Sequence, residues 1–351
     1  MNFTIPNTRE YRKVIYPILK YRIMFENKKI LITGGTGSLG HALTRRLLTM
    51  GVDTIRIFSR NESKQVHMYE EFQDKRLRFL IGDVRDLPRL TRAMEEIDII
   101  FHAAALKHVP VVEYNPFEAI KTNIIGSQNV IDACLANDVE VAVCVGTDKA
   151  VSPLNTYGAT KLLMEKLFVT ASNYLNKEFH RTRFVAVRYG NVLGSSGSVV
   201  PKFIEQIKSG ENITITDPSM TRFNITMDQA LDFIFRAVKK GQSGEVFVPK
   251  LKAYKLNDMK DALLELYNAK NPVKIISVRP GEKYHESLIN KDELRYTLED
   301  KDDYLVTENN ENVKKRGFSK TNMTEQYSSN NVELITKEEL KTILLKEKFI
   351  S

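Results

Sequence analysis

Residues 29–40 read Lys-Ile-Leu-Ile-Thr-Gly-Gly-Thr-Gly-Ser-Leu-Gly, an apolar run followed at once by a glycine-rich turn. The run predicts a buried strand over Ile30–Thr33, and a helix is expected after the turn. Gly34, Gly37 and Gly40 give the spacing Gly-x-x-Gly-x-x-Gly. Glycine permits a tight turn there and lets backbone N–H groups approach a pyrophosphate at the helix N-terminus. The stretch therefore predicts an open α/β sheet with a dinucleotide site beside its first strand.

The rest of the chain up to about residue 191 repeats this alternation of strand-like and helix-like segments, which indicates a parallel sheet covered on both faces. Further strand-like runs are Thr54–Phe58, Leu77–Ile81, Ile97–Ala103, Val139–Val145 and Phe184–Tyr189. After residue 191 the alternation loosens, and we expect short strands at 213–216, 245–248 and 273–276 among helices at 201–209, 227–239 and 256–267. We predict a Rossmann-type doubly wound parallel sheet with a smaller α/β substrate-binding domain.

The expected domain boundaries follow from these patterns. An N-terminal extension covers 1–23, the Rossmann domain 24–190, and a partly interleaved substrate-binding domain 191–298. A polar C-terminal arm over 299–351, with a helix at 337–345, is expected to pack on the body or on a neighbouring subunit.

Composition limits the classes of protein that fit. The 351 residues carry a net charge of +8, of which the first 23 residues contribute +4. No uncharged apolar run reaches the ~18 residues of a membrane span, and no signal-peptide pattern is visible. Cys134 and Cys144 lie in apolar segments and are expected to be buried free thiols of a cytoplasmic protein. We find no nucleic-acid-reading motif and predict no metal site.

The first 25 residues allow two interpretations. Tyr11, Val14, Ile15, Ile18 and Leu19 could form the apolar face of a basic helix that binds a membrane surface or a partner, although Pro17 interrupts it. Alternatively, the segment is an accessory leader, since Met24 stands just ahead of the first strand.

The cofactor site is expected around the glycine-rich turn. NAD enzymes usually have an acid at the end of the second strand, where this chain has Ser59 and Arg60, with Lys64 nearby. These side chains suit a 2′-phosphate, so we predict NADP in preference to NAD. Asp83 is expected to meet the adenine amino group or, alternatively, to be a helix N-cap. The predicted cofactor-binding residues are Thr36, Gly37, Ser38, Leu39, Ser59, Arg60, Asn61, Lys64, Asp83, Val84, Ala103, Lys107, Tyr157 and Lys161.

Candidate catalytic residues lie after the strand Val139–Val145. Tyr157 and Lys161, at i and i+4, share one face of a helix, so the lysine could lower the pKa of the phenol and let it act as a base on a hydroxyl. Asp148 and Lys149 precede them at the carboxyl end of the strand, where open α/β sheets bind ligands. The set predicts oxidation of a sugar hydroxyl followed by acid–base chemistry at the neighbouring carbons.

Together these stretches resemble the extended short-chain dehydrogenase/reductases that act on nucleotide sugars. Within that superfamily the chain is most similar to the inverting UDP-N-acetylglucosamine 4,6-dehydratases (5-epimerising) of bacterial surface-glycan pathways. The resemblance runs from about residue 24 to the C-terminus. It rests on residues 33–40, 81–86, 102–110, 121–124, 147–150, 157–161, 188–192, 220–223 and 279–283. The specific part is Asp148-Lys149, because retaining sugar dehydratases have Asp-Glu there.

The resemblance implies that Tyr157 takes the C4 hydroxyl proton, that Lys149 removes the C5 proton, and that Asp148 protonates the departing C6 hydroxyl. Lys149 would then need a pKa lowered by burial, by Lys161 or by the nicotinamide charge. Alternatively, Lys149 merely pairs with Asp148. The implied product is UDP-2-acetamido-2,6-dideoxy-β-L-arabino-hex-4-ulose, and tightly bound NADP is recycled in each turnover.

The resemblance also implies ligands for the UDP-sugar and an oligomer. The expected substrate-binding residues are Lys107, Asn191, Thr216, Arg222, Arg279 and Glu282. Relatives commonly have Ser-Arg-Gly-Ser where this chain has Ser195-Ser196-Gly197-Ser198, which puts one phosphate contact in doubt. A homo-oligomer, dimer or hexamer, is expected. The competing functions are a UDP-sugar 4-epimerase and a non-catalytic NADP-binding sensor.

Overall fold

The computed structural model describes residues 21–176, 179–195, 197–308 and 313–349. The apolar face expected at Tyr11–Leu19 therefore lies outside the described residues. Residues 21–25 are helical, and their buried Tyr21 and Phe25 pack edge-on or tilted against Phe235, with ring centroids 5.7 and 4.8 Å apart. The chain thus enters the fold through an apolar anchor on the main core.

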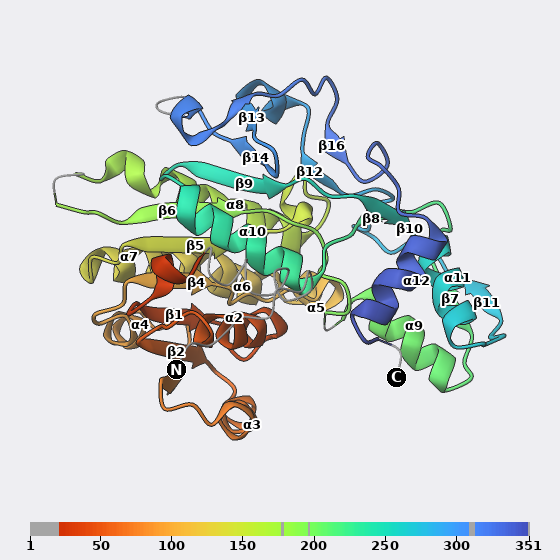
Figure 1. The fold of residues 1–351 in the computed structure, drawn as a ribbon, viewed down its shortest axis with the longest axis horizontal. Coiled ribbons are helices and arrows are strands. Elements are labelled where there is room, and N and C mark those ends of the chain that lie inside the picture. Colours follow the sequence, from red (N-terminus) through yellow and green to blue (C-terminus); the bar gives the residue numbers. More distant parts are fainter. Residues whose placement is uncertain (1–20, 177–178, 196, 309–312, 350–351) are drawn as a thin grey trace, which may run out of the picture.

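One ten-stranded sheet forms the centre of the molecule, in the order β15-β13-β14-β9-β6-β5-β4-β1-β2-β3 (Figure 1). The strands from β9 through β3 run parallel, whereas β14, β13 and β15 extend the β9 edge antiparallel. The bounds are β1 Lys29–Thr33, β2 Thr54–Ser59, β3 Leu77–Ile81, β4 Ile99–His102, β5 Val141–Val145, β6 Arg183–Val187, β9 Glu245–Pro249, β13 Thr297–Glu299, β14 Asp303–Val306 and β15 Ser319–Lys320.

Two apolar cores cover the two faces of this sheet because alternate strand residues point to opposite sides. Ile30 and Ile32 of β1 join the core under α2 and α10, while Leu31 joins the core under α4, α7 and α8. These helices and their connections span α2 Ser38–Leu48, α3 Glu62–Phe72, α4 Leu87–Ala93, α5 Val109–Tyr114, α6 Pro116–Ala119, the π-helix η1 Ile120–Ile125, α7 Gly126–Ala136, the 3-10 turn η2 Asp148–Ala150, α8 Thr156–Thr170, the 3-10 turn η3 Ala171–Tyr174 and α10 Met227–Lys240.

A smaller part lies beside the sheet, where Figure 1 shows α9, α11 and α12 together with β7 and β11. It has its own core, which includes Phe203, Leu263 and Leu340. Three two-stranded pairs belong to the later part of the chain: β7 with β11, β8 with β10, and β12 with β16. The bounds are α9 Val199–Lys208, β7 Ile213–Ile215, β8 Thr221–Phe223, β10 Ala253–Lys255, α11 Leu256–Leu266, β11 Val273–Ile275, β12 Ser287–Ile289, η4 Asp292–Tyr296, η5 Lys314–Arg316, β16 Tyr327–Ser328 and α12 Lys337–Lys346.

These elements confirm the predicted α/β class, the parallel sheet and the helices of the later segment. The C-terminal arm packs on the body, because β14 and β15 extend the sheet and α12 contributes to the smaller core. The predicted domain boundaries stay a prediction. β9 and β14 come from the later part of the chain but belong to the central sheet, so the two parts interleave. Cys134 and Cys144 are buried free thiols as expected.

A buried ion cluster joins the sheet to the later segment. The Arg188 guanidinium, just after β6, donates two hydrogen bonds of 2.6 Å to the Glu165 carboxylate on α8. It also donates to the Glu293 carboxylate at 2.6 and 2.9 Å and to the Leu288 carbonyl at 3.1 Å. Because both carboxylates saturate the buried guanidinium, the cluster holds β12 at a defined place beside the carboxyl ends of the central strands.

Candidate active site

The glycine-rich turn shapes the first of two adjoining cavities. Gly34 has φ +66°, and a Cβ there would lie 2.9 Å from the Ala104 backbone. Gly37 is the N-cap residue of α2, so the first N–H groups of that helix face the cavity. The cavity has a volume of about 540 Å³. Glycine thus lets two backbone segments meet and leaves a helix N-terminus available for an anion.

The predicted cofactor residues all line this first cavity. They are Thr36, Gly37, Ser38, Leu39, Ser59, Arg60, Asn61, Lys64, Asp83, Val84, Ala103, Lys107, Tyr157 and Lys161. They come from the end of β2, from the segments that follow β1, β2, β3 and β4 and from α8, at the edge where parallel strands present their carboxyl ends.

The end of β2 carries the groups expected to select the cofactor. Arg60 and Lys64 line the cavity, and the Asn61 side chain caps α3 by accepting from the Lys64 N–H at 2.8 Å. Asp83 is held by Arg85, whose Nε and Nη2 donate to Oδ2 at 2.9 and 2.7 Å. Burial raises the pKa of Asp83, but its hydrogen bonds with Arg85 and the charges of Arg85 and Arg60 lower it below its usual value. The N-cap alternative for Asp83 is wrong, because Asp86 caps α4.

A buried polar chain fixes the loop that follows β4. His102 lies between the Thr33 and Ser127 hydroxyls, at 2.8 Å from Nδ1 and 2.9 Å from Nε2. Ser127 donates to the Asn123 carbonyl at 2.6 Å, so Nε2 of His102 carries the proton and Nδ1 accepts from Thr33. The Asn123 amide in turn holds both the N–H and the carbonyl of Leu106. The π-helix thereby positions the loop containing Ala103 and Lys107.

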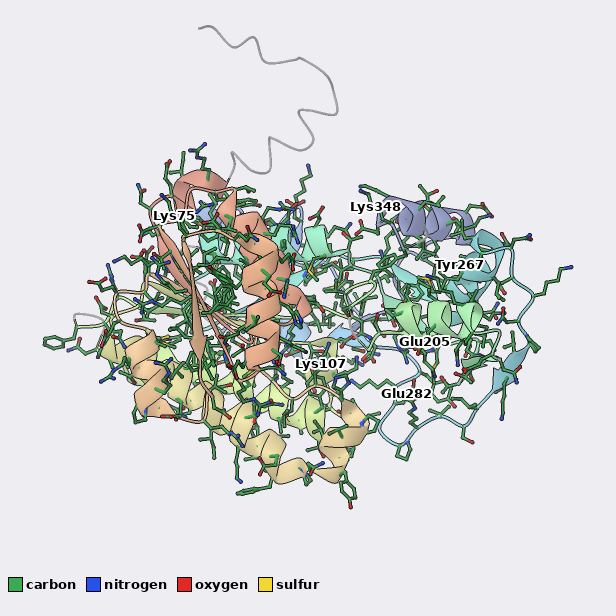
Figure 2. All side chains as sticks on the ribbon, turned by 90° about the horizontal axis from the view of Figure 1, so that it is seen from below. Lys75, Lys107, Glu205, Tyr267, Glu282 and Lys348 are labelled. Atoms are coloured by element: carbon green, nitrogen blue, oxygen red, sulfur yellow. The ribbon has the colours of Figure 1, made fainter. Side chains whose placement is uncertain are left out.

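A second cavity, of about 600 Å³, adjoins the first. Both cavities share Lys107, Thr147, Tyr157 and Asn191 in their walls. Figure 2 shows Lys107 between the sheet part and the part that carries Glu205 and Tyr267. The predicted substrate-binding residues all line this second cavity: Lys107, Asn191, Thr216, Arg222, Arg279 and Glu282.

Tyr157 and Lys161 lie on one face of α8, and both line the first cavity, but their electrostatics differ from the expectation. The Lys161 ammonium donates to the Val145 carbonyl at 2.6 Å, and burial lowers its pKa to about 8. Burial raises the pKa of Tyr157; the charge of Lys149 and a hydrogen bond with Thr147 oppose that rise. Lys149, and not Lys161, is the cation that acts on the phenol, so the expectation that Lys161 lowers the pKa of Tyr157 is wrong.

Lys149 is paired on two sides. Its Nζ lies 3.1 Å from Asp148 Oδ1 and 3.4 Å from Glu286 Oε1. Burial lowers the pKa of Lys149, but the charges of Asp148 and Glu286 outweigh burial and raise it above its usual value. The expected lowering of the Lys149 pKa is therefore wrong, because the two carboxylates raise it. The alternative in which Lys149 merely pairs with Asp148 is incomplete as well, because the Glu286 carboxylate also pairs with Lys149.

Asp148 stands behind this lysine. Its side chain is 2% exposed and accepts from the Thr147 hydroxyl at 2.9 Å and from the Lys149 ammonium. Lys149 lines the second cavity, whereas Asp148 is not among the residues that line either of the two cavities. A proton on Asp148 would therefore reach a ligand after local movement or through Thr147 or Lys149.

Sequence reasoning missed several polar residues in these walls. Glu286, Lys283 and Lys202 line the second cavity, and Thr122 lines the first with a buried hydroxyl that has no hydrogen-bond partner among the described residues. Thr122 lies within a stretch that carried the resemblance, and Glu286 follows another such stretch closely. Nothing local in the sequence showed that the Glu286 side chain reaches Lys149.

The N-terminus of α9 and the cationic side chains near it form one wall of the second cavity, the cationic wall. Ser198 is the N-cap residue, and its Oγ has no partner within the described part of the chain. Lys202, one turn further on, has a pKa lowered by burial and then by the charge of Arg279. Arg222 lies 3.4 Å from Glu282 and donates to the Tyr284 carbonyl at 3.0 Å. A helix N-terminus with converging cations suits a diphosphate.

Comparison with known proteins gives consistent results. Residues 30–308 match the family described as "Polysaccharide biosynthesis protein". An inverting UDP-N-acetylglucosamine 4,6-dehydratase of Campylobacter jejuni is 46% identical over 81% of this chain and 84% of its own. A UDP-glucose 4-epimerase of Rickettsia rickettsii is 40% identical over 92% of this chain and 96% of its own. The crystal structure of Pen from Bacillus thuringiensis is 41% identical, with a TM-score of 0.85, and covers 92% of this chain and 99% of that one.

None of the described helices combines the length and the hydropathy that a membrane span requires.

Proposed function

The chain belongs to the family of polysaccharide biosynthesis proteins, and from this premise we propose that it is an inverting UDP-N-acetylglucosamine 4,6-dehydratase. The product would be UDP-2-acetamido-2,6-dideoxy-β-L-arabino-hex-4-ulose. The observation that carries the proposal is Lys149, which is held by carboxylates and lines the second cavity next to Tyr157. Such a site offers a second acid–base centre in addition to the tyrosine.

NADP is the cofactor that the first cavity favours. The α2 N-terminus would take the pyrophosphate, Arg60 and Lys64 would meet the 2′-phosphate, and the unpartnered Thr122 hydroxyl offers a further hydrogen bond. The walls formed by these residues fit a dinucleotide. When bound, the nicotinamide supplies the acceptor and later the donor of a hydride.

Tyr157 is the proposed base for the C4 hydroxyl. It lies in the wall that both cavities share, so a sugar in the second cavity can reach both the tyrosine and the first cavity. Burial raises the pKa of Tyr157, so the phenol carries its proton at rest. Lys149 opposes that rise, and Thr147 bonds the phenol, so both groups assist proton removal from Tyr157.

Lys149 and Asp148 are the proposed pair for elimination. The Asp148 carboxylate and the Lys149 amine share one proton. At rest that proton is on Lys149, which is an ammonium. Transfer across the 3.1 Å contact from Nζ to Oδ1 would create a neutral amine and a carboxylic acid at once. The amine can then take the C5 proton. The acid can pass its proton through the Thr147 hydroxyl, which lines both cavities, to the C6 oxygen as it leaves as water.

The cationic wall at α9 is the proposed site for the diphosphate of the substrate. Burial is the main cause of the lowered pKa of Lys202, and repulsion by the charge of Arg279 adds to it. Two phosphate charges would relieve this repulsion, and Ser198 and the first N–H groups of α9 would add hydrogen bonds. The uridine and sugar would then extend along the walls that contain Thr216 and Asn191.

A UDP-sugar 4-epimerase is the second candidate, because an epimerase from Rickettsia is a relative of similar length. That reaction needs Tyr157 but has no step for a second base. The buried ion pairs of Lys149 favour the dehydratase. A homo-oligomer and a cytoplasmic location stay predictions from the sequence.

An NMR experiment in heavy water tests the function. The purified chain is incubated with UDP-N-acetylglucosamine, and the sugar resonances are followed. We expect a C6 methyl group, deuterium at C5 and ring couplings of the L-arabino configuration. UDP-N-acetylgalactosamine with an intact C6 hydroxyl would instead establish an epimerase. A deuterated D-xylo product would leave a dehydratase without inversion.

A further inference from the structure

Glu286 is held rigidly at the edge of the second cavity, just before β12. Its backbone N–H donates to the Ser329 hydroxyl at 3.0 Å. Its carbonyl accepts from the Ser329 N–H at 2.8 Å and from the Ser328 hydroxyl at 3.1 Å. The neighbouring Leu288 carbonyl accepts from buried Arg188. These contacts involve no side-chain atom of Glu286, so the carboxylate is positioned by the fold and not by its own pairing.

The Glu286 carboxylate is unusual in its surroundings. The residue is 3% exposed, and Oε2 has no hydrogen-bond partner among the residues that the structure describes. The other oxygen lies 3.4 Å from Lys149 Nζ. A buried carboxylate oxygen without a partner destabilises a fold, so such a group is expected where function requires its charge. Glu286 shares the second cavity with Lys149 and with the proposed substrate-binding residues.

We propose that Glu286 is a positioning residue for the elimination step, whose carboxylate stabilises the ammonium that Lys149 becomes on taking the C5 proton. The inference rests on the proposed function. Before the step, Lys149 is a neutral amine, Asp148 a carboxylic acid and Glu286 a carboxylate. During it, the C5 proton moves to Lys149, the C6–O bond breaks, and the Asp148 proton leaves with the oxygen as water. The electron pair of the C5–H bond becomes the C5–C6 double bond.

The state after this step has the charges of the resting structure, with the Lys149 ammonium between the Asp148 and Glu286 carboxylates. Glu286 therefore stabilises the ammonium on both sides of the elimination: it draws the C5 proton onto the neutral amine and restores the resting pair. It also opposes loss of the shared proton to solvent, because a nearby negative charge raises the pKa of an ammonium. The structure shows that effect, since Glu286 is among the groups that raise the pKa of Lys149.

Other charged and titratable groups also face Lys149, and the test must keep them constant. Arg222 lowers the pKa of Lys149, and Tyr157 raises it. Burial raises the pKa of Tyr254 and lowers that of Lys283, and at both residues the charge of Lys149 acts to lower the pKa. Among these groups only Asp148 and Glu286 form a described ion pair with Lys149. Replacement of Glu286 alone therefore isolates one carboxylate.

The experiment compares Glu286→Gln with Glu286→Asp in the full chain with its bound nicotinamide cofactor. Gln keeps the volume and can still present an oxygen to Lys149, but it removes the charge. Asp292→Asn is the matched control, because it removes a carboxylate from the same segment at an exposed position. Release of the 4-keto sugar from UDP-N-acetylglucosamine is measured over a range of pH. Reduction of the nicotinamide in a single turnover reports C4 oxidation separately, and thermal unfolding checks the fold.

For Glu286→Gln we expect the alkaline limb of kcat to move to lower pH by about one unit, because removal of the carboxylate lowers the pKa of Lys149. The kcat at the optimum should change by no more than about tenfold, because one pKa unit is tenfold in proton affinity and a lower pKa makes the neutral amine easier to form but a weaker base. C4 oxidation and KM should stay near wild type. Glu286→Asp should restore the limb at least in part, and Asp292→Asn should match wild type.

Two results would overturn the inference alone. One is a Glu286→Gln profile with the wild-type alkaline limb while the wild-type chain dehydrates the substrate. The other is an equal loss of kcat at every pH in both Glu286 variants, with lowered thermal stability, which would indicate a purely structural role. A wild-type chain that releases no keto sugar would overturn the proposed function and this inference with it.

Discussion

Acidification is expected to destabilise the protein through His102, a buried residue at the end of β4. The imidazole is fully buried between Thr33 and Ser127 and stacks on Phe168, with ring centroids 5.8 Å apart. Burial, together with the charge of Lys161, lowers the pKa of His102 from 6.5 to about 3. The neutral ring uses one nitrogen as donor and the other as acceptor, and protonation would leave Nδ1 facing the Thr33 hydroxyl as a second donor.

The size of the effect follows from the difference between the folded and unfolded pKa values. Between pH 6.5 and about 3 the unfolded chain binds a proton at His102 that the folded chain does not. The free energy of unfolding therefore falls as the pH falls through this window. Each pH unit below 6.5 costs about 1.4 kcal/mol, so His102 alone should lower the free energy of unfolding by about 2 kcal/mol at about pH 5.

Denaturant unfolding of the wild type and of His102→Gln at about pH 7 and about pH 5 measures this contribution. Glutamine can donate to Ser127 and accept from Thr33, but it does not titrate. The carboxylates and the other histidines are common to both chains. The difference between the two chains in how far acidification lowers the free energy of unfolding therefore isolates His102. Wild type should lose about 2 kcal/mol more than the variant on acidification. Equal losses in both chains would refute the buried neutral imidazole and the proton placement derived from the Ser127 bond.

Further predictions concern the two cavities. Tyr157→Phe should lower the rate of C4 oxidation by about 10²–10⁴-fold and leave the bound nicotinamide oxidised, as absorbance after substrate addition would show. Lys149→Met should still permit reduction of the nicotinamide but release no dehydrated sugar; near-native dehydration would make Lys149 structural. Arg60→Asp should weaken NADP binding by about 1.5–3 kcal/mol and relatively favour NAD in calorimetric titrations, whereas equal wild-type affinity for both cofactors would contradict the NADP assignment. Lys202→Ala should raise KM for the UDP-sugar with little change in kcat, and Lys208→Ala, on the exposed side of the same helix, should leave both unchanged.

The sequence was sufficient for the fold class and for the location of both cavities. Apolar runs and their periodicity depend on local backbone geometry, so the strands from β1 to β6 and the later helices could be placed from the sequence alone. The glycine spacing after β1 placed the α2 N-terminus at a cavity. The resemblance added the substrate-binding residues, all of which line the second cavity.

The charge state of the acid–base groups could not be obtained in the same way. Sequence spacing placed Tyr157 and Lys161 on one helix face, but Lys161 donates to the Val145 carbonyl and its charge is not what acts on the phenol. The pattern also suggested a lowered pKa for Lys149, whereas two carboxylates raise it. The group that acts on Tyr157 is Lys149, and one of the carboxylates that act on Lys149 is Glu286. Neither lies on α8, the helix that carries Tyr157 and Lys161.

The amino-acid sequence by itself thus determined which elements form, the edge of the sheet at which they present polar residues, and the type of chemistry those residues can perform. Only the tertiary structure decided that Glu286 meets Lys149, that Lys202 and Arg279 share one wall, and that His102 is buried without charge. The physical reason is that secondary structure depends on neighbours within a few residues. Protonation instead depends on burial and on charges within a few ångströms in space, which segments distant in the chain supply.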